Sequence, residues 1–213
     1  NGAGKSTCMK IMTGFLAPDS GTGRVAGLSI DECDESFQRS LGYLPEHAPL
    51  YNEMTVGGFL RFASQMRNFY GSEGQTRVKA AAEKCGLCDV LGKNIGTLSK
   101  GYRQRVGIAQ AVIHDPQVLI LDEPTSGLDP NQIEDVRRLI RGFGEDKTIL
   151  FSSHVLTEVS AVADRIIILN QGQIVADDTP DNLIERISGN TIRLVIRGGT
   201  SDALVNWAKA RPF

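Results

Sequence analysis

The sequence predicts an α/β fold built on a mainly parallel β-sheet. Short runs of β-branched and other apolar residues alternate with segments of helical periodicity, which is typical of parallel-sheet proteins. The run from Val118 to Leu121 is entirely apolar, as expected of a central strand that is covered on both faces. Residues 46–114 are rich in helical patterns and lie between two strand-rich stretches, so we expect a helical insertion there.

The expected elements follow from these patterns in chain order. Helices are expected at residues 4–14, 55–70, 76–85, 103–113, 131–143 and 179–187. Strands are expected at residues 24–26, 118–121, 148–151, 165–169 and 191–196. The helix at 55–70 would bury one apolar side made of Phe59, Leu60, Phe62, Ala63 and Met66. The main domain would then span residues 1–187, and residues 188–213 would begin a C-terminal extension that is itself truncated.

Composition excludes several classes of protein. Of the 213 residues, 41% are apolar and 23% are charged, which is an ordinary globular balance. The net charge of −2 argues against a protein that coats nucleic acid, so no nucleic-acid partner is expected. No run approaches the roughly 20 apolar residues that cross a bilayer, so a membrane role would require a partner subunit. Four cysteines are too few for a disulfide-stapled module of this length.

The first residues match the end of the phosphate-binding motif G-x-x-x-x-G-K-[ST]. Glycines let the backbone N–H groups converge on phosphate oxygens, and the following helix points its positive end at the same anion. Lys5 would reach the β- and γ-phosphates, the Ser6 hydroxyl would bind Mg²⁺, and Thr7 would bond a neighbouring phosphate. The expected phosphate-binding residues are Asn1, Gly2, Ala3, Gly4, Lys5, Ser6 and Thr7.

Two qualifications apply to this motif. Taken alone, it also fits a glycine-rich turn that caps a helix beside a solvated lysine. Its opening glycine would precede Asn1, and the chain begins without a methionine, so we expect an N-terminally truncated fragment.

The apolar run that ends at Leu121 is followed by two carboxylates, Asp122 and Glu123. Ligands of open α/β sheets bind at the carboxyl ends of the strands. Asp122 would hold Mg²⁺, directly or through water, and Glu123 would act as general base on the attacking water. The alternative is that both carboxylates only terminate a strand.

Four further stretches carry a resemblance to a known family. Residues 98–105 (L-S-K-G-Y-R-Q-R) resemble the signature sequence of ABC transporter ATP-binding subunits, and residues 126–130 (S-G-L-D-P) resemble their D-loop. Residues 151–154 (F-S-S-H) resemble the strand that ends in the switch histidine, and residues 42–46 (G-Y-L-P-E) lie where the family has its Q-loop. Order and spacing resemble the family from residue 1 to about 187.

The resemblance implies an ABC-type P-loop ATPase fold in which two nucleotide-binding domains meet head to tail with ATP and Mg²⁺ between them. The second domain would come from a homodimer or a heterodimer. His154 would contact the γ-phosphate and the attacking water, and Asp129 would link the two sites. Glu46 would bind ATP and Mg²⁺ at the Q-loop. The signature residues that would act on ATP in trans are Ser99, Lys100, Gly101 and Tyr102.

Three positions depart from the family pattern. Lys100 replaces a glycine, Tyr102 replaces a glutamine, and Glu46 replaces the glutamine of the Q-loop. Lys100 could add favourable charge beside the γ-phosphate. These variants resemble bacterial ABC exporter ATPases linked to multidrug export and gliding motility. The resemblance therefore implies export through a transmembrane permease subunit, with this chain peripheral on the cytoplasmic face of the inner (plasma) membrane.

Two other functions stay open from the sequence alone. One is a soluble ABC ATPase that acts on ribosomes or DNA, and the other is a nucleotide-binding regulator that does not turn over. Among the remaining residues, Cys85 and Cys88 form a C-x-x-C that we interpret as structural thiols. Cys8 is expected to pack on the first helix, and His114 to favour the dipole at a helix C-terminus.

Overall fold

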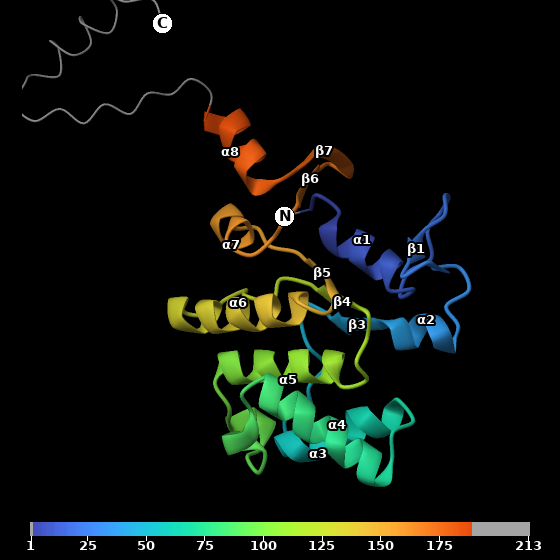
Figure 1. Ribbon diagram of the computed structural model, residues 1–213, viewed down its shortest axis with the longest axis vertical. Coiled ribbons are helices and arrows are strands. Elements are labelled where there is room, and N and C mark those ends of the chain that lie inside the picture. The colour runs from blue at the N-terminus through green and yellow to red at the C-terminus, as the bar shows by residue number, and fades with distance from the viewer. Residues whose placement is uncertain (1, 189–213) are drawn as a thin grey trace, which may run out of the picture.

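The computed structural model describes residues 2–188 (Figure 1). The helices are α1 (Lys5–Met12), α2 (Glu35–Ser40), α3 (Val56–Met66), α4 (Gly71–Lys84), α5 (Lys100–Val112), α6 (Pro130–Gly144), α7 (Leu156–Ser160) and α8 (Pro180–Ser188), with 3₁₀ turns η1 (Cys88–Val90) and η2 (Ile95–Thr97). The strands are β1 (Arg24–Val25), β2 (Leu28–Ser29), β3 (Leu41–Leu44), β4 (Val118–Leu121), β5 (Thr148–Phe151), β6 (Ile166–Asn170) and β7 (Gln173–Asp178).

The central sheet has the order β3-β4-β5, and both neighbouring pairs are parallel. Leu44, Leu121 and Phe151 are in register, so the three strands end together at one edge of the sheet. The expected α/β class with a parallel sheet is therefore confirmed. The pairs β1–β2 and β6–β7 are separate antiparallel hairpins.

Strand β4 is covered on both faces, as its continuous apolar sequence predicts. Leu119 and Leu121 belong to a large core cluster that also contains residues of α3, α4, α5 and α6. Ile120 points to the opposite face, where it packs in a second cluster with Met9 of α1 and Phe37 of α2. This division follows the two-residue period of side chains along a strand. Helices therefore lie on both sides of the sheet (Figure 1).

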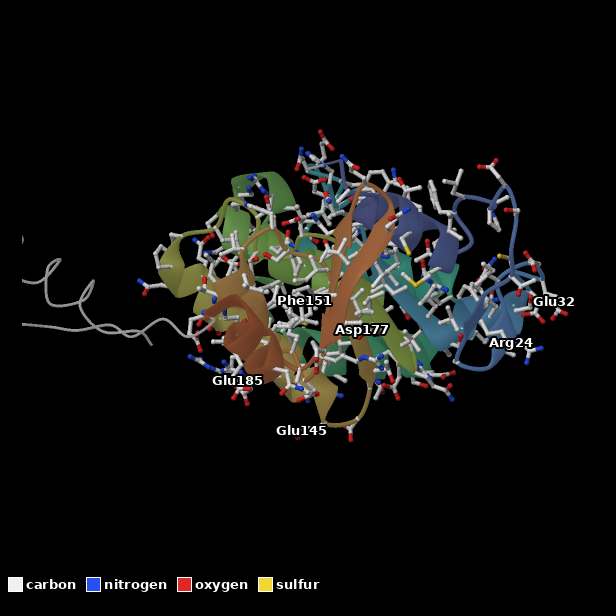
Figure 2. The ribbon with its side chains drawn as sticks, turned by 90° about the horizontal axis from the view of Figure 1, so that it is seen from above. Arg24, Glu32, Glu145, Phe151, Asp177 and Glu185 are labelled. Carbon is white, nitrogen blue, oxygen red and sulfur yellow. The ribbon has the colours of Figure 1, made fainter. Side chains whose placement is uncertain are left out.

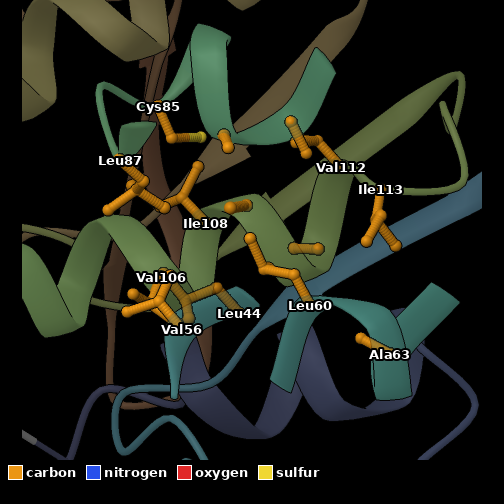
Figure 3. Close-up of a cluster of buried hydrophobic side chains, with 14 of the residues drawn as sticks. Leu44, Val56, Leu60, Ala63, Cys85, Leu87, Val106, Ile108, Val112 and Ile113 are labelled. Atoms are coloured by element: carbon orange, nitrogen blue, oxygen red, sulfur yellow. The ribbon is translucent and has the colours of Figure 1, made fainter. Parts of the chain in front are cut away.

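Helices α3, α4 and α5 form a layer of their own at one side of the molecule (Figure 1). Their shared core includes Val56 and Leu60 from α3, Ala82 from α4, and Val106 and Ile108 from α5 (Figure 3). All five of these side chains are fully buried. Burial of each larger apolar side chain, such as Val, Leu or Ile, stabilises the fold by about 1.5–3 kcal/mol. This layer holds the N-terminus of α5, which carries the signature residues.

Three expectations for this layer are wrong. Helix α4 begins at Gly71 rather than residue 76, because its first turns contain glycines and polar residues that give no apolar period. Phe62 and Met66 do not face the core, since 39% and 68% of their surface is exposed. Helix α3 ends at Met66, so the last turn expected up to residue 70 is also absent.

Four short elements were not expected from the sequence: β2, α2, β3 and α7. Helix α2 has only six residues, and its local signal is the cap at Asp34, whose side chain accepts a hydrogen bond of 2.8 Å from the Phe37 amide. Strand β3 contains Gly42, where an added Cβ would lie 2.2 Å from the carbonyl oxygen of Ala111. The close approach of β3 to α5 therefore depends on a glycine that weakens the strand pattern.

The described chain ends in the β6–β7 hairpin and α8. Arg165 donates two hydrogen bonds to Asp177 at 2.6 and 2.7 Å, and Figure 2 labels Asp177 on this hairpin. The strand expected at 191–196, and the extension beyond α8, lie outside the described residues. Within residues 2–188, no helix is both long and apolar enough to cross a membrane.

Candidate active site

The carboxyl edge of the central sheet gathers most of the residues that the sequence singled out. Asp122 and Glu123 follow β4, and His154 lies in the loop after β5. His154 Nδ1 lies 2.8 Å from Glu123 Oε2. The Nζ of Lys5, at the start of α1, lies 3.9 Å from Glu123 Oε1. The end of β4, the start of α1 and the loop after β5 thus meet at one carboxylate.

The phosphate loop has the backbone that its glycines permit. Gly2 and Gly4 have φ values of 84° and 100°, which side chains with a Cβ rarely adopt. Gly4 is the N-cap of α1 and supplies no capping side chain. The first N–H groups of α1, from Lys5 onward, have no partner within the helix. This end of α1 can therefore accept an anion.

The turn of the β6–β7 hairpin contacts the phosphate loop. Gly172 N–H donates a hydrogen bond of 3.0 Å to the carbonyl of Ala3. Gln171 and Gly172 both have positive φ, as a tight hairpin turn requires. This contact between distant segments was not expected from the sequence. Asn1 lies outside the described residues.

The two acidic residues of the strand end are buried, and one hydroxyl binds the side chain of the first and the backbone amide of the second. Asp122 is 2% exposed and Glu123 is 9% exposed. Ser152 Oγ donates a hydrogen bond of 2.6 Å to Asp122 Oδ1 and accepts one of 2.8 Å from the Glu123 N–H. Glu123 has a φ of 49°, so a residue with a side chain takes a left-handed conformation here. Such conformations outside glycine cluster at functional sites.

Glu158 forms a second set of hydrogen bonds beside those of Ser152. Glu158 of α7 accepts hydrogen bonds from Thr125 Oγ1 at 2.5 Å and from Ser153 Oγ at 3.3 Å. It therefore ties the chain after Glu123 to the loop that carries His154. Glu158 and Thr125 were not singled out from the sequence, because α7 is only five residues long and gave no periodic signal.

Tyr43 adds a neutral group near Asp122. Its hydroxyl is buried without a hydrogen-bond partner among the described residues. Burial, and secondarily the negative charge of Asp122, raises the pKa of Tyr43 above its ordinary value. Tyr43 therefore keeps its proton at neutral pH beside the acidic strand end.

The signature residues and Asp129 lie at the N-termini of two other helices. Ser99 caps α5 by accepting a hydrogen bond of 3.4 Å from the Tyr102 amide, and Asp129 caps α6 by accepting one of 3.0 Å from the Gln132 amide. Within residues 2–188, no hydrogen bond or ion pair joins Ser99 or Asp129 to Asp122 or Glu123. The structure brings these two sets of residues to separate places in one chain.

The side chain of Lys100 packs against the D-loop (residues 126–130) of its own chain. A Cβ added at Gly127 would lie 2.2 Å from Lys100 Nζ, so the ammonium rests against that turn of the backbone. A Cβ at Gly101 would lie 2.7 Å from the side chain of Gln132, so α5 and α6 also approach closely there. The expected place of Lys100 beside a phosphate stays a prediction.

Oxygen donors for Mg²⁺ are present at the sheet edge. Asp122 keeps one carboxylate oxygen beyond that bound by Ser152, and the Ser6 hydroxyl lies in the first turn of α1. Glu46 lies in the loop after β3, with an exposed side chain. No group of three or more His, Cys, Asp or Glu side chains forms a metal cage within residues 2–188. Mg²⁺ bound with a nucleotide needs only one or two protein carboxylates, since phosphates and water complete its shell, so these residues fit.

The cysteines and His114 differ partly from expectation. Cys85 is buried, and burial raises its pKa to about 12, so it stays a protonated structural thiol as expected. Cys8 is exposed rather than packed. His114 is buried, and burial lowers its pKa to about 4. It is therefore neutral at pH 7, and the expected charge–dipole interaction is wrong.

The comparison with known families decides which family this arrangement belongs to. The sequence pattern of the family described as ABC transporter matches residues 1–126. The chain belongs to the ABC transporter family. An uncharacterised ABC transporter ATP-binding protein of Synechocystis sp. is 38% identical over 207 residues, which cover 96% of this chain and 57% of the relative. The linearmycin resistance ATP-binding protein LnrL of Bacillus subtilis is 32% identical over 96% of this chain and 66% of its own length.

Solved structures agree with this assignment. The structure of cbiO1 from Clostridium perfringens, part of the ABC transporter complex cbiONQ, superposes with a TM-score of 0.78 at 26% identity. The match covers 88% of this chain and 80% of cbiO1. The expected ABC ATPase fold is therefore confirmed. The chain spans 57% of the length of the Synechocystis relative.

Proposed function

We propose that the protein binds ATP with Mg²⁺ and hydrolyses it to power export of a substrate by a transmembrane permease, through ATP-driven dimerisation of its nucleotide-binding domains. One observation carries the proposal. Lys5, Glu123 and His154 converge at the carboxyl edge of a parallel sheet, beside the amides that open α1. A cation, a buried carboxylate and an imidazole at a phosphate loop are the groups that phosphoryl transfer to water requires.

Each group has a role that its position supports. The loop from Gly2 to Gly4 and the first amides of α1 bind the phosphates, and Lys5 neutralises their charge. Glu123 accepts a proton from the attacking water, and burial strengthens the electrostatic interactions of its carboxylate. His154, hydrogen bonded to Glu123 and still more than half exposed, orients that carboxylate and can reach the phosphate.

Mg²⁺, when bound, neutralises charge that develops on the β- and γ-phosphates. Ser6, Asp122 and Glu46 are the residues that would hold it. Asp122 is the best placed of the three, because its buried carboxylate is already fixed by Ser152. Glu46 is the least fixed, because its side chain is exposed.

The other half of each ATP site comes from a second nucleotide-binding domain. Ser99 and Asp129 are exposed at helix N-termini, and within residues 2–188 their side chains form hydrogen bonds only with the helices that they cap, so both groups are available to a partner. We propose that Ser99, Lys100, Gly101 and Tyr102 meet the γ-phosphate of the opposite domain, with Asp129 at the contact. ATP then joins the two domains, and hydrolysis loosens them.

An exposed apolar surface on α3 supports a membrane partner. We define the α3 patch as Tyr51, Phe62 and Met66; Phe62 and Met66 are one helical turn apart, and the rings of Tyr51 and Phe62 meet edge to face at 5.9 Å. All three side chains are more than a third exposed. Such patches mark interaction sites, and we propose that a permease segment docks here. The protein would then be held peripherally on the cytoplasmic face of the membrane.

Export is the finer part of the proposal. LnrL is named for resistance to linearmycin, and retinal-specific ABCA4 of Homo sapiens, a phospholipid-transporting ATPase, is 36% identical over 84% of this chain. The resistance named for LnrL, together with the sequence variants at Lys100 and Glu46, supports outward transport. No observation favours a ribosome or DNA partner.

The test uses the intact protein with its permease in sealed inverted vesicles. We expect substrate accumulation in the lumen and phosphate release, both dependent on ATP and Mg²⁺ and both lost in Glu123→Gln. Phosphate release without any need for the permease, together with salt-sensitive binding of RNA, would move the function to a soluble ABC ATPase.

A further inference from the structure

We infer that Ser152 is a positioning residue for ATP hydrolysis, whose single hydroxyl binds both the Asp122 carboxylate and the backbone amide of Glu123. The inference rests on the proposed function, because it takes Asp122 and Glu123 as the residues that act on ATP and Mg²⁺. Ser152 is 4% exposed, so its hydrogen bonds do not compete with bulk water.

The position of Ser152 follows from strand register. Leu121 of β4 pairs with Phe151 of β5, so the next residues, Asp122 and Ser152, leave the sheet side by side. The Ser152 N–H donates to the Leu121 carbonyl at 3.0 Å, which extends the ladder by one bond. Only a short side chain with a hydroxyl can then reach both the Asp122 carboxylate and the Glu123 amide.

The hydroxyl fixes the orientation of Asp122. It donates its one proton to Oδ1 at 2.6 Å, a distance typical of a charge-assisted bond between a hydroxyl and a carboxylate. Rotation of the carboxyl group is thereby prevented, and Oδ2 is the oxygen left for a cation. Loss of the hydroxyl would leave Asp122 buried with an unsatisfied oxygen.

The same hydroxyl fixes the turn at Glu123. It accepts the Glu123 N–H at 2.8 Å and so stabilises a left-handed φ of 49°. That turn places Glu123 Oε2 2.8 Å from His154 Nδ1 and Oε1 3.9 Å from Lys5 Nζ. Without the bond, the buried amide is unpaired, and a peptide rotation that satisfies it would move the Glu123 carboxylate away from both groups.

The effect can be separated from simple packing. The backbone bond from Ser152 to Leu121 does not involve the side chain, and Glu158 still ties Ser153 to Thr125 when Ser152 changes. Variants at Ser152 therefore keep two independent links between β4 and the loop after β5.

The test compares Ser152→Thr with Ser152→Val in the intact protein, because Thr and Val have the same shape and differ only in the hydroxyl. We expect Ser152→Thr to keep kcat within about threefold of the wild type, and Ser152→Val to lower kcat between about 10- and 100-fold. KM for ATP should stay nearly unchanged, because the phosphate loop is untouched. The Mg²⁺ concentration for half-maximal rate should rise in Ser152→Val but not in Ser152→Thr. Ser152→Ala, which needs no extra space, should repeat the loss of Ser152→Val.

Two results would overturn the inference. One is equal, wild-type activity in all three variants. The other is an equal loss in Ser152→Thr and Ser152→Val that follows their unfolding temperatures, which would assign Ser152 a packing role. Glu123→Gln is measured in parallel. Full activity of that variant defeats the proposed function itself, whereas an inactive Glu123→Gln beside an active Ser152→Val defeats only the inference about Ser152.

Discussion

The acidic strand end and the signature segment are built in opposite ways. Asp122 and Glu123 are buried, and side chains from the loop after β5 and from α1 fix their positions. Ser99 and Asp129 are exposed at helix N-termini, and within the described part of the chain their side chains form hydrogen bonds only with the helices that they cap. The difference teaches that one chain preorganises the half of the site that we propose to activate water. The half that we propose to close over the nucleotide depends on what docks against it.

The largest expected effect is at the acidic strand end. Glu123→Gln removes the general base but keeps the size of the side chain, so we expect kcat to fall by about 10²–10⁴-fold. ATP binding and ATP-dependent dimers should persist, because Lys5 and the signature residues are unchanged. Phosphate release and size-exclusion chromatography with ATP measure both properties.

Glu145→Gln is the matched control, because Glu145 is an exposed carboxylate at the end of α6, far from the strand end (Figure 2). It should leave kcat unchanged. Equal losses in the two variants would mean that lost charge, rather than the position of Glu123, sets the rate.

The next largest effect concerns the layer that supports the signature segment. Leu60 is fully buried between α3 and its neighbours (Figure 3), so Leu60→Ala should lower the free energy of unfolding by about 2–5 kcal/mol. Phe62, two residues further along the same helix, lies in the exposed α3 patch, so Phe62→Ala should cost less, about 0.5–1.5 kcal/mol from its ring contact with Tyr51. Urea unfolding compares the two, and a larger loss in Phe62→Ala would show that its side chain is buried.

A pH dependence of stability is expected from His114. Its Nε2 lies 2.9 Å from the Leu41 carbonyl. Burial, and then the positive charge of Arg67, lower its pKa to about 4, although the Leu41 hydrogen bond and the charge of Asp115 act in the opposite direction. Between pH 6.5 and about 4 the unfolded chain therefore binds a proton that the folded chain does not. Stability should fall as the pH drops through this window, by up to about 3 kcal/mol.

His114→Gln should flatten this part of the pH profile, as measured by urea unfolding at pH 7 and pH 4.5. The glutamine amide can still donate to the Leu41 carbonyl but does not titrate. An unchanged slope in the variant would assign the pH dependence to other groups.

A small effect on stability is expected at the helix caps. Ser99→Ala and Thr55→Ala each remove a side chain that caps a helix, α5 and α3 respectively, and each should cost about 1 kcal/mol. Only Ser99→Ala should also weaken ATP-dependent dimers, because Thr55 lies outside the signature. Equal ATP-dependent dimerisation of both variants would show that Ser99 does not take part in the nucleotide site.

Much of the fold could be predicted from the sequence, and the reason is visible in β4. Its apolar run identifies a doubly covered strand, and the helices with clear periods, α1, α3, α5, α6 and α8, lie within a few residues of their expected places. Strand β3 was not expected, because Gly42 and the short length of the strand hide its apolar pattern. The strand is stabilised by tertiary contact with α5, which the sequence pattern does not show. The exposure of Phe62 and Met66 could not be predicted, since apolar period alone does not show which side of a helix is covered.

The candidate site could be predicted as a set of residues but not as a network. The motifs identify Lys5, Asp122, Glu123 and His154, and the structure brings all four to one sheet edge. Ser152 was visible only as part of the stretch before His154, because its two hydrogen bonds depend on strand register. The roles of Ser99, Lys100 and Asp129 stay predictions, since they require a second chain.

The central claim is that each ATP site combines the acidic strand end of one chain with the signature segment of another. The most direct measurement mixes two inactive variants of the intact protein, Lys5→Ala and Ser99→Asp, and follows phosphate release. Aspartate preserves the cap of α5 but places a negative charge where Ser99 would meet the γ-phosphate. Random mixing should restore about a quarter of wild-type activity, because half of the dimers are mixed and each has one intact site. A mixture that stays as inactive as either variant alone would contradict the shared site.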